Sequence, residues 1–346
     1  MSLNDFPTFD CNQTNLKLST QFYQLLTDRS NYVLKRIQIL PKKIVDENPD
    51  IQEIIRQTGL EVASVNDDLT GYHEVVISDS TMMKMFIECY CALYLKPIPM
   101  EQTLIPAIVI LLITPNDTTA IKKLWQRIRC LNDKIQVLPI FFILGGYLSC
   151  NYDKTNKSSC LWNLFKKLLI KLKNDEFSYC SDVNLKIKLS QCDSASFDNN
   201  LLYYSIKVCL RSVSEHPRNY YATSALRFFL KRYKHENNEE LYLEITKQVS
   251  IMNYDLSLWK VICDCLLLTP KSIDCRCQEN SQPCGFCIGK KKISPRLVDM
   301  ILSYGSEQLF TYLLLLLSDG GEDLVNSVEN MDVKTLKETI KKLLIK

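Results

Sequence analysis

Glycine is scarce in this chain of 346 residues, which contains only 9 glycines beside 17 tyrosines and 13 phenylalanines. Folds with many tight β-turns, and loops that cradle phosphate with their backbone, both depend on glycine. The composition therefore argues against such folds and favours long helices joined by short loops. The segment from Gly285 to Lys290 is one residue too short for a phosphate-binding loop, and Lys291 stands where that loop needs Ser or Thr. We expect no nucleotide cofactor.

Long apolar runs and a strong excess of one charge are also missing. The chain has 42 basic and 39 acidic residues, a formal net charge of +3, which is too small to indicate nucleic-acid binding. The apolar runs at Leu104–Ile113, Val137–Leu148 and Leu309–Leu317 are each shorter than the ~20 residues of a membrane-spanning helix. We expect three buried helices in a protein that is not integral to a membrane.

Features of an export signal are absent from the first ten residues, which are polar and acidic. The chain has 15 cysteines, an odd number, and only 3 histidines, none of them in a pair with metal-ligand spacing. These observations predict a reducing, cytoplasmic compartment. Most of the cysteines are then expected to be small buried apolar side chains.

The hydrophobic pattern changes along the chain. Residues 1–45 have helical spacing, whereas residues 60–80 contain two short β-branched segments that form either a small hairpin or an irregular insertion. The last helix is expected to begin after Asp332, a favourable N-cap. The predicted divisions are N-terminal helices with the insertion at 1–80, helical-hairpin repeats at 81–270 with a loop insertion at 174–199, a cysteine-rich loop at 271–293, and C-terminal helices at 294–346.

Four segments share a pattern in which a polar turn precedes an amphipathic helix. Aligning Ile121, Trp162, Thr223 and Trp259 gives separations of 41, 61 and 36 residues, and the long middle gap contains the 174–199 insertion. This spacing predicts stacked antiparallel helical hairpins, each burying one face against its neighbour. The alternative is an all-α protein in which Trp and Leu at helical spacing indicate no repeat. The residues expected to pack between hairpins are Trp125, Trp162, Trp259 and Phe228.

The third of these segments resembles a known repeat. Residues 217–230 read Pro-Arg-Asn-Tyr-Tyr-Ala-Thr-Ser-Ala-Leu-Arg-Phe-Phe-Leu, which is similar to the protein prenyltransferase α-subunit repeat, roughly Pro-Lys-Asn-Tyr-His-Ala-Trp-Ser-His-Arg-Arg-Trp-Leu-Leu. Trp162 and Trp259 match the tryptophan of that repeat, whereas its His-Arg-Arg triplet survives only as Arg227. The resemblance covers residues 80–270. It implies an all-α, crescent-shaped superhelix of helical hairpins and favours a diverged, geranylgeranyl-transferring member of the family.

The resemblance further implies the α subunit of a heterodimeric protein geranylgeranyltransferase. In that family the β subunit holds the catalytic zinc, which makes the acceptor cysteine a thiolate. The implied partners are therefore a prenyltransferase β subunit, geranylgeranyl diphosphate and an acceptor protein. The family's Lys-Asn-Tyr, beside the diphosphate, matches Arg218, Asn219 and Tyr220, and a cation at position 218 would offset the charge of the leaving group. The alternative is that Arg218 is a solvated loop arginine.

Four cysteines are clustered near residue 280 in the spacing Cys-x-Cys, six residues, Cys-x-x-Cys. Four thiolates can close a tetrahedral zinc site, which would be structural because no coordination position stays open. The alternative is an exposed loop of reduced thiols, since the gap between the pairs is shorter than in common zinc ribbons. The candidate ligands are Cys275, Cys277, Cys284 and Cys287.

A second function also fits the sequence. The loss of most His-Arg-Arg triplets is compatible with a non-catalytic helical-repeat scaffold that binds other proteins, with the cysteine cluster as a structural zinc clip. A third interpretation makes that cluster the main site of a zinc-dependent interaction module.

Overall fold

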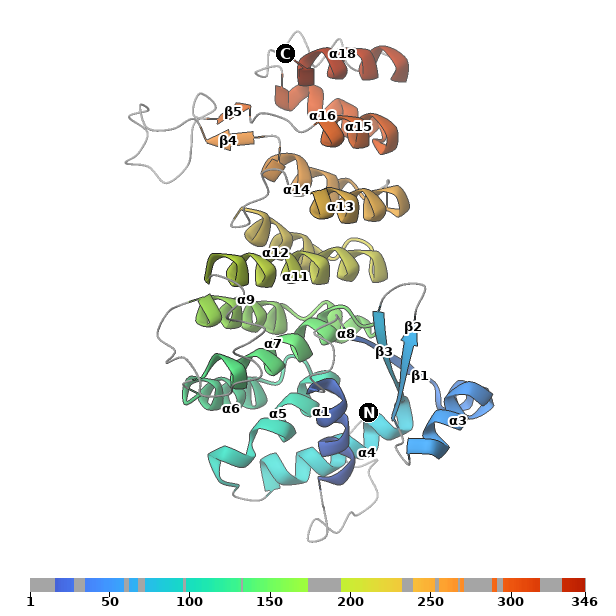
Figure 1. The fold of residues 1–346 in the computed structure, drawn as a ribbon, viewed down its shortest axis with the longest axis vertical. Coiled ribbons are helices and arrows are strands. Elements are labelled where there is room, and N and C mark those ends of the chain that lie inside the picture. The colour runs from blue at the N-terminus through green and yellow to red at the C-terminus, as the bar shows by residue number, and fades with distance from the viewer. Residues whose placement is uncertain are drawn as a thin grey trace. The chain divides into compact units, whose positions relative to one another are not determined.

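The computed structural model describes residues 16–27, 35–58, 62–67, 72–95, 98–131, 133–173, 194–231, 239–252, 255–266, 268–270, 288–290, 295–317 and 332–345. The chain divides into two compact units, an N-terminal unit, Met1–Tyr204, and a C-terminal unit, Ser205–Lys346. The described residues are mostly helical (Figure 1), which confirms the predicted all-α character in its coarse form. Within this part of the chain, no helix is both long enough and apolar enough to cross a membrane.

The N-terminal unit opens with a small sheet packed among helices. The elements run α1 (Lys17–Thr27), β1 (Lys35–Leu40), α2 (Lys42–Glu47), α3 (Pro49–Thr58), β2 (Val62–Asp67), β3 (Tyr72–Ser78) and α4 (Asp79–Tyr90). Strand β3 lies in the centre, antiparallel to β2 and parallel to β1. Ile37 of β1 pairs with Val75 of β3, and both side chains are fully buried.

Two expectations for this region can now be judged. Strands β2 and β3 pair antiparallel, as in the hairpin that was the first of the two alternatives for 60–80. The prediction of helix throughout residues 1–45 is wrong, because residues 35–40 form β1. Its sequence Lys-Arg-Ile-Gln-Ile-Leu has isoleucines two residues apart, and the backbone hydrogen-bonding groups of β1 are satisfied by β3, which lies more than thirty residues away in sequence. The hydrophobic pattern within residues 1–45 therefore could not predict the pairing of β1 with β3.

Helical hairpins make up the rest of the N-terminal unit. After the π-helical turn η3 (Cys91–Leu95) and the 3-10 turn η4 (Met100–Gln102) come α5 (Leu104–Ile113), α6 (Thr118–Arg129), α7 (Lys134–Leu148), α8 (Asp153–Asn156) and α9 (Ser159–Lys173). Helix α5 packs on α4 and α6, and α7 packs on α9. The core between α7 and α9 contains a stacked pair, Phe141 and Phe165, with ring centroids 4.5 Å apart.

A glycine sets the distance between α7 and the first part of α11 (Ser194–Glu215). A Cβ at Gly145 would collide with the Tyr204 hydroxyl, which donates a hydrogen bond to the Phe142 carbonyl at 3.3 Å. Residues 194–199, predicted to end a loop insertion, belong to this helix, while residues 174–193 of that insertion lie outside the described part of the chain.

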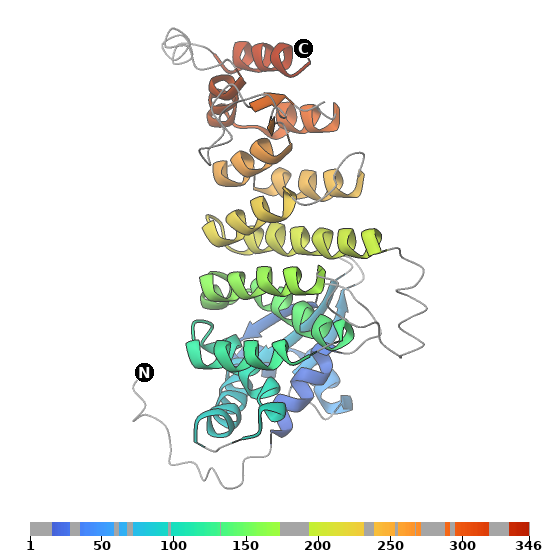
Figure 2. The ribbon, with the colours of Figure 1, turned by 90° about the vertical axis from the view of Figure 1, so that its left-hand side faces the viewer.

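The C-terminal unit continues with α12 (Tyr220–Leu230), α13 (Glu239–Ile251), α14 (Leu256–Leu266), α15 (Pro295–Tyr304), α16 (Glu307–Leu317) and α18 (Val333–Ile345). Within it, α12 packs on α14, α14 on α16 and α16 on α18, while α13 packs on α15. Helices α12, α14 and α16, each the second helix of its hairpin, thus pack on one another in succession, and α18 follows α16 (Figures 1 and 2). The core side chains Phe229, Trp259 and Phe310 are fully buried.

The three apolar runs form helices, as predicted. Helix α5 coincides with Leu104–Ile113, α7 contains Val137–Leu148, and α16 contains Leu309–Leu317. A short ladder, β4 (Leu268–Pro270) antiparallel to β5 (Ile288–Lys290), pairs Pro270 with Ile288. It joins the two ends of the segment that contains the clustered cysteines.

Candidate functional site

Eight of the described helices begin in the same way, with a polar side chain that caps the first turn. Two of them are α3 and α4, capped by Asn48 and Ser78, and the other six lie further along the chain. In each, the side-chain oxygen of the capping residue accepts a hydrogen bond from the backbone N–H three residues later, at 2.7 to 3.3 Å. This bond satisfies an amide that has no partner within the helix. The caps of α6, α9, α12, α14, α16 and α18 are Asp117, Ser158, Asn219, Asp255, Ser306 and Asp332.

The four residues aligned in the sequence occupy one position in this arrangement. Ile121, Trp162, Thr223 and Trp259 each donate their backbone N–H to the carbonyl of the capping residue four positions earlier. The same bond recurs in α16 and α18, at Phe310 and Leu336, both buried. The four aligned residues therefore share one position relative to the starts of their helices, and α16 and α18 have the same position. Val45, Gln52 and Ala107 make the same bond at the starts of α2, α3 and α5, so the bond identifies the start of a helix and not a repeat. The signal for α16 and α18, which the alignment did not include, was a Ser or Asp followed four residues later by a large apolar side chain.

Capping residues also connect one hairpin to the next. Ser158, the cap of α9, donates to the Pro115 carbonyl at 3.2 Å and to Asn116 Oδ1 at 2.8 Å, in the turn before α6. In the C-terminal unit, Asp255, the cap of α14, accepts from the backbone N–H of Arg218, in the turn before α12. In both units the cap of the later hairpin thus binds the residue just before the cap of the earlier one.

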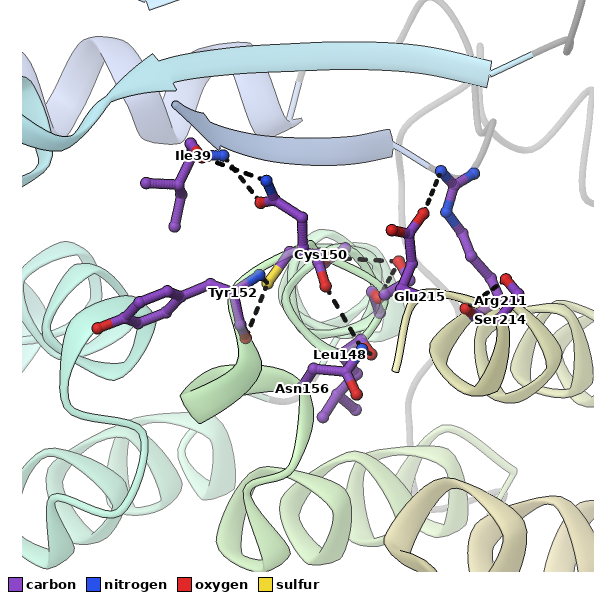
Figure 3. Close-up of polar contacts among 12 residues, drawn as sticks. Ile39, Leu148, Cys150, Tyr152, Asn156, Arg211, Ser214 and Glu215 are labelled. Atoms are coloured by element: carbon purple, nitrogen blue, oxygen red, sulfur yellow. Dashed lines mark hydrogen bonds and ion pairs between the residues drawn. The ribbon is translucent and has the colours of Figure 1, made fainter. Parts of the chain in front are cut away.

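The connection between α7 and α9 is held by buried side chains (Figure 3). The side chain of Asn156 donates to the carbonyl of Leu148 at 2.8 Å. The backbone carbonyl of Asn156 accepts from the Trp162 indole at 2.8 Å. Thr155 donates to the Leu112 carbonyl at 2.6 Å, at the end of α5. Each bond pairs a buried polar group, so these contacts fix the turn rather than leave a reactive group open.

A second polar connection reaches the small sheet. The side chain of Asn151 accepts from the backbone N–H of Ile39 at 3.0 Å and donates to its carbonyl at 3.2 Å, and so pairs with β1 as a neighbouring strand would. In the C-terminal unit, Arg211 is buried and lies 3.3 Å from Glu215, one turn later on α11 (Figure 3). These contacts are structural.

The residues matched to the diphosphate site lie at the start of α12. Asn219 is buried, its Oδ1 accepts from the Ala222 N–H, and its Nδ2 donates to Ser212 at 3.1 Å. Arg218 is exposed and has a left-handed backbone with φ of 62°. Tyr220 is 70% exposed. Asn219 is thus satisfied internally, while Arg218 and Tyr220 face solvent.

The residues expected to pack between hairpins differ in burial. Trp162 and Trp259 are fully buried, whereas Trp125 and Phe228 are partly exposed. Beside Phe228, the side chain of Phe229 is completely buried. The ammonium of Lys167 lies 5.8 Å from the centroid of the Trp125 ring, which places α9 beside α6.

The predicted zinc ligands Cys275, Cys277, Cys284 and Cys287 lie outside the described residues. Among the residues that are described, no three His, Cys, Asp or Glu side chains are grouped so as to hold a metal ion. Most of the described cysteines are buried, as predicted, and none of these is in a disulfide. Burial raises the pKa of Cys89 to about 12, so this thiol is a packing group and not a nucleophile.

Four exposed aromatic and apolar side chains lie where the hairpins of the C-terminal unit turn, and two others, Leu243 in the middle of α13 and Val333 at the start of α18, lie elsewhere. Tyr220 and Tyr221 begin α12 and are 70% and 48% exposed. Ile251 ends α13 at 61%, and Tyr304 ends α15 at 36%. Together with Arg218 they form a surface that we call the turn edge. In the N-terminal unit, the turns before α6 and α9 expose polar groups instead, Thr114, Asn116, Thr118, Asp153 and Lys157. The connection between α4 and α5 exposes Leu95 and Met100.

The comparisons with known proteins point to a different family from the one expected. The family model described as the ECM9 middle domain matches residues 161–283, less than half of the chain. No curated protein matches.

The prediction of a prenyltransferase α-subunit repeat family, and of a geranylgeranyltransferase α subunit, is therefore wrong. The structure explains why the segments looked alike. A polar cap with buried apolar residues three, four and seven positions later starts a helix in a hairpin, whatever the family. Asn219 is such a cap, and the residues that follow it form the first turns of α12. The diphosphate role of Arg218, Asn219 and Tyr220 rested on the resemblance and stays an untested prediction.

Proposed function

We propose that this chain is a non-catalytic scaffold of stacked helical hairpins that binds a partner protein through the turn edge. The superhelical stacking of repeats is part of this proposal. It is supported by the similar hydrogen bonds that link successive hairpins in each unit. Arrays of this kind bury a continuous core and present side chains from successive repeats along one side.

The observation that supports the binding role is the composition of the turn edge. Tyrosine and arginine are enriched at the energetically dominant positions of protein interfaces, because they combine large contact area with polar groups that can pair. A Tyr at 70% exposure and an Ile at 61% cost solvation free energy in the free protein, and a partner that covers them recovers it. The polar turns before α6 and α9 show that a hairpin turn does not itself require apolar residues.

Position-specific photo-crosslinking tests this proposal. We expect benzoylphenylalanine at Tyr220 to give one discrete adduct in native extract. The same probe at Lys341, exposed on α18 about two turns from the start of that helix, is the control and should give none. Tyr221→Ser together with Ile251→Ser should abolish the Tyr220 adduct without changing the circular dichroism spectrum. Equal adducts at Tyr220 and Lys341, or an adduct that survives the double substitution, would contradict the proposal.

A further inference from the structure

Two neighbouring helices of the N-terminal unit contain no acidic residue. Helix α6 reads Thr-Thr-Ala-Ile-Lys-Lys-Leu-Trp-Gln-Arg-Ile-Arg, and α9 reads Ser-Cys-Leu-Trp-Asn-Leu-Phe-Lys-Lys-Leu-Leu-Ile-Lys-Leu-Lys. The chain as a whole is nearly balanced in charge, with a formal net charge of +3. The basic residues of these helices are therefore locally unopposed by carboxylates of their own helices.

The two helices lie side by side and start at the same end. Their caps are joined through the hydrogen bond between Ser158 and Asn116, next to Asp117. Further along, Lys167 of α9 lies over the Trp125 ring of α6. Figure 2 shows α9 directly above α6 on the face turned to the viewer. Basic side chains from both helices therefore contribute to one surface.

Three of these basic side chains are exposed, Lys122 and Arg129 on α6 and Lys167 on α9. Basic residues in a last turn offset the helix dipole, which accounts for Arg129 in part. Lys122 and Lys167 lie in the middle of their helices, where interaction with the helix dipole does not explain a basic residue. Lys123 is already engaged, because it donates to the Leu93 carbonyl at 2.6 Å. We call Lys122, Arg129, Lys167 and Ile170, which is 47% exposed, the basic face.

The side chains around the basic face decide what kind of anion it fits. Single-stranded nucleic acid needs exposed aromatic rings on which bases stack, but Trp125 is partly buried and Lys167 lies over its ring. A membrane surface needs a broad apolar face to insert, whereas Ile170 is the one exposed large apolar side chain on the described parts of α6 and α9. Carboxylates on a polypeptide need only spaced cations and an apolar contact.

We propose that the basic face binds an acidic polypeptide segment, which lies across α6 and α9 with one apolar side chain against Ile170. Its carboxylates pair with Lys122, Arg129 and Lys167. Because these pairs are exposed, the attraction is screened by salt, and binding weakens as ionic strength rises. This surface is independent of the turn edge, so either can be tested while the other is intact.

The test uses a fluorescein-labelled peptide of Glu and Asp with one central Leu, and measures binding to the full chain by fluorescence anisotropy. The variant Lys122→Glu/Arg129→Glu/Lys167→Glu should lower affinity by about tenfold or more, as expected for the loss of three exposed charge pairs. The control Lys247→Glu/Lys334→Glu/Lys341→Glu changes net charge equally at exposed positions elsewhere and should bind as the unmodified chain does. Ile170→Ser should weaken binding with no change in its salt dependence.

Several results would overturn the proposal. They are no binding by the unmodified chain, equal losses in both triple variants, or tighter binding of single-stranded RNA or phosphatidylserine vesicles through the same three residues. If the Glu variant does not fold, as judged by circular dichroism, Lys122→Gln/Arg129→Gln/Lys167→Gln replaces it, with a smaller expected loss. A full retention of affinity in that variant would also contradict the proposal.

Discussion

Asp255 caps one helix and holds the turn before another. Its Oδ1 accepts from the backbone N–H groups of Ser257 and Leu258 at 2.9 and 3.1 Å, at the start of α14. Its Oδ2 accepts from the N–H of Arg218 at 3.4 Å, just before α12. Only 4% of Asp255 is exposed, so water has little access to replace these bonds.

Asp255→Ala should therefore destabilise the C-terminal unit by about 2 kcal/mol, the combined cost of a lost cap and of buried amides left unpaired. We expect urea denaturation to show a lower midpoint, and hydrogen exchange to show faster exchange at the start of α14. Asp332→Ala removes the cap of α18, which is exposed, and should cost less. An equal effect of the two substitutions would contradict the double role of Asp255.

Arg218→Gly should make the protein more stable. A left-handed backbone costs a residue with a Cβ about 1 kcal/mol relative to glycine, and Arg218 has a φ of 62°. The gain should appear as a higher denaturation midpoint, whereas Arg218→Ala, which keeps the Cβ, should show none. A lower midpoint for the glycine variant would mean that the Arg218 side chain contributes more stability than its backbone strain removes.

Asn156→Ala should destabilise the N-terminal unit by about 2 kcal/mol, because it removes the buried hydrogen bond to the Leu148 carbonyl. Asn163→Ala, at an exposed position on α9, is the matched control and should be near neutral. Thermal unfolding followed by circular dichroism separates the two. Similar midpoints for both variants would show that the side chain of Asn156 is replaced by water.

Alkylation should distinguish Cys130 from Cys89. Burial raises the pKa of Cys89 to about 12, so at any lower pH the folded state holds it as the unreactive thiol. In the unfolded chain the pKa returns to its ordinary value, and the group becomes reactive at mildly alkaline pH. We expect mass spectrometry to find iodoacetamide on the exposed Cys130 of the native protein, and on Cys89 only after denaturation. Rapid labelling of native Cys89 would contradict its burial.

Zinc binding by Cys275, Cys277, Cys284 and Cys287 is still a prediction from sequence. We expect one zinc ion per chain in protein purified under reducing conditions, measured by elemental analysis. Cys275→Ser/Cys277→Ser should remove it, whereas Cys130→Ser, at an exposed cysteine elsewhere, should retain it. Protein that contains no zinc, or that retains it after the double substitution, would exclude the site.

The sequence predicted local structure better than assembly. Helix α5 has the same bounds as the predicted apolar run, and Asp332 caps α18 as expected, because both features depend on residues a few positions apart. Strand β1 was missed, since its partner β3 is distant in the chain. The turn edge and the basic face were missed for a similar reason. The exposure of Tyr220, Ile251 and Lys167 depends on how the hairpins stack. Residue type alone does not predict it.

The β4–β5 ladder has a consequence for how this protein can be engineered or can diverge. Because Pro270 and Ile288 are paired, the two ends of the intervening segment already meet, as they do at the base of any hairpin. The segment can therefore be shortened or exchanged for another sequence without moving α14 or α15, since the cost of closing a loop changes only slowly with its length. The β4–β5 pairing thus implies tolerance of changes in chain length between residues 270 and 288.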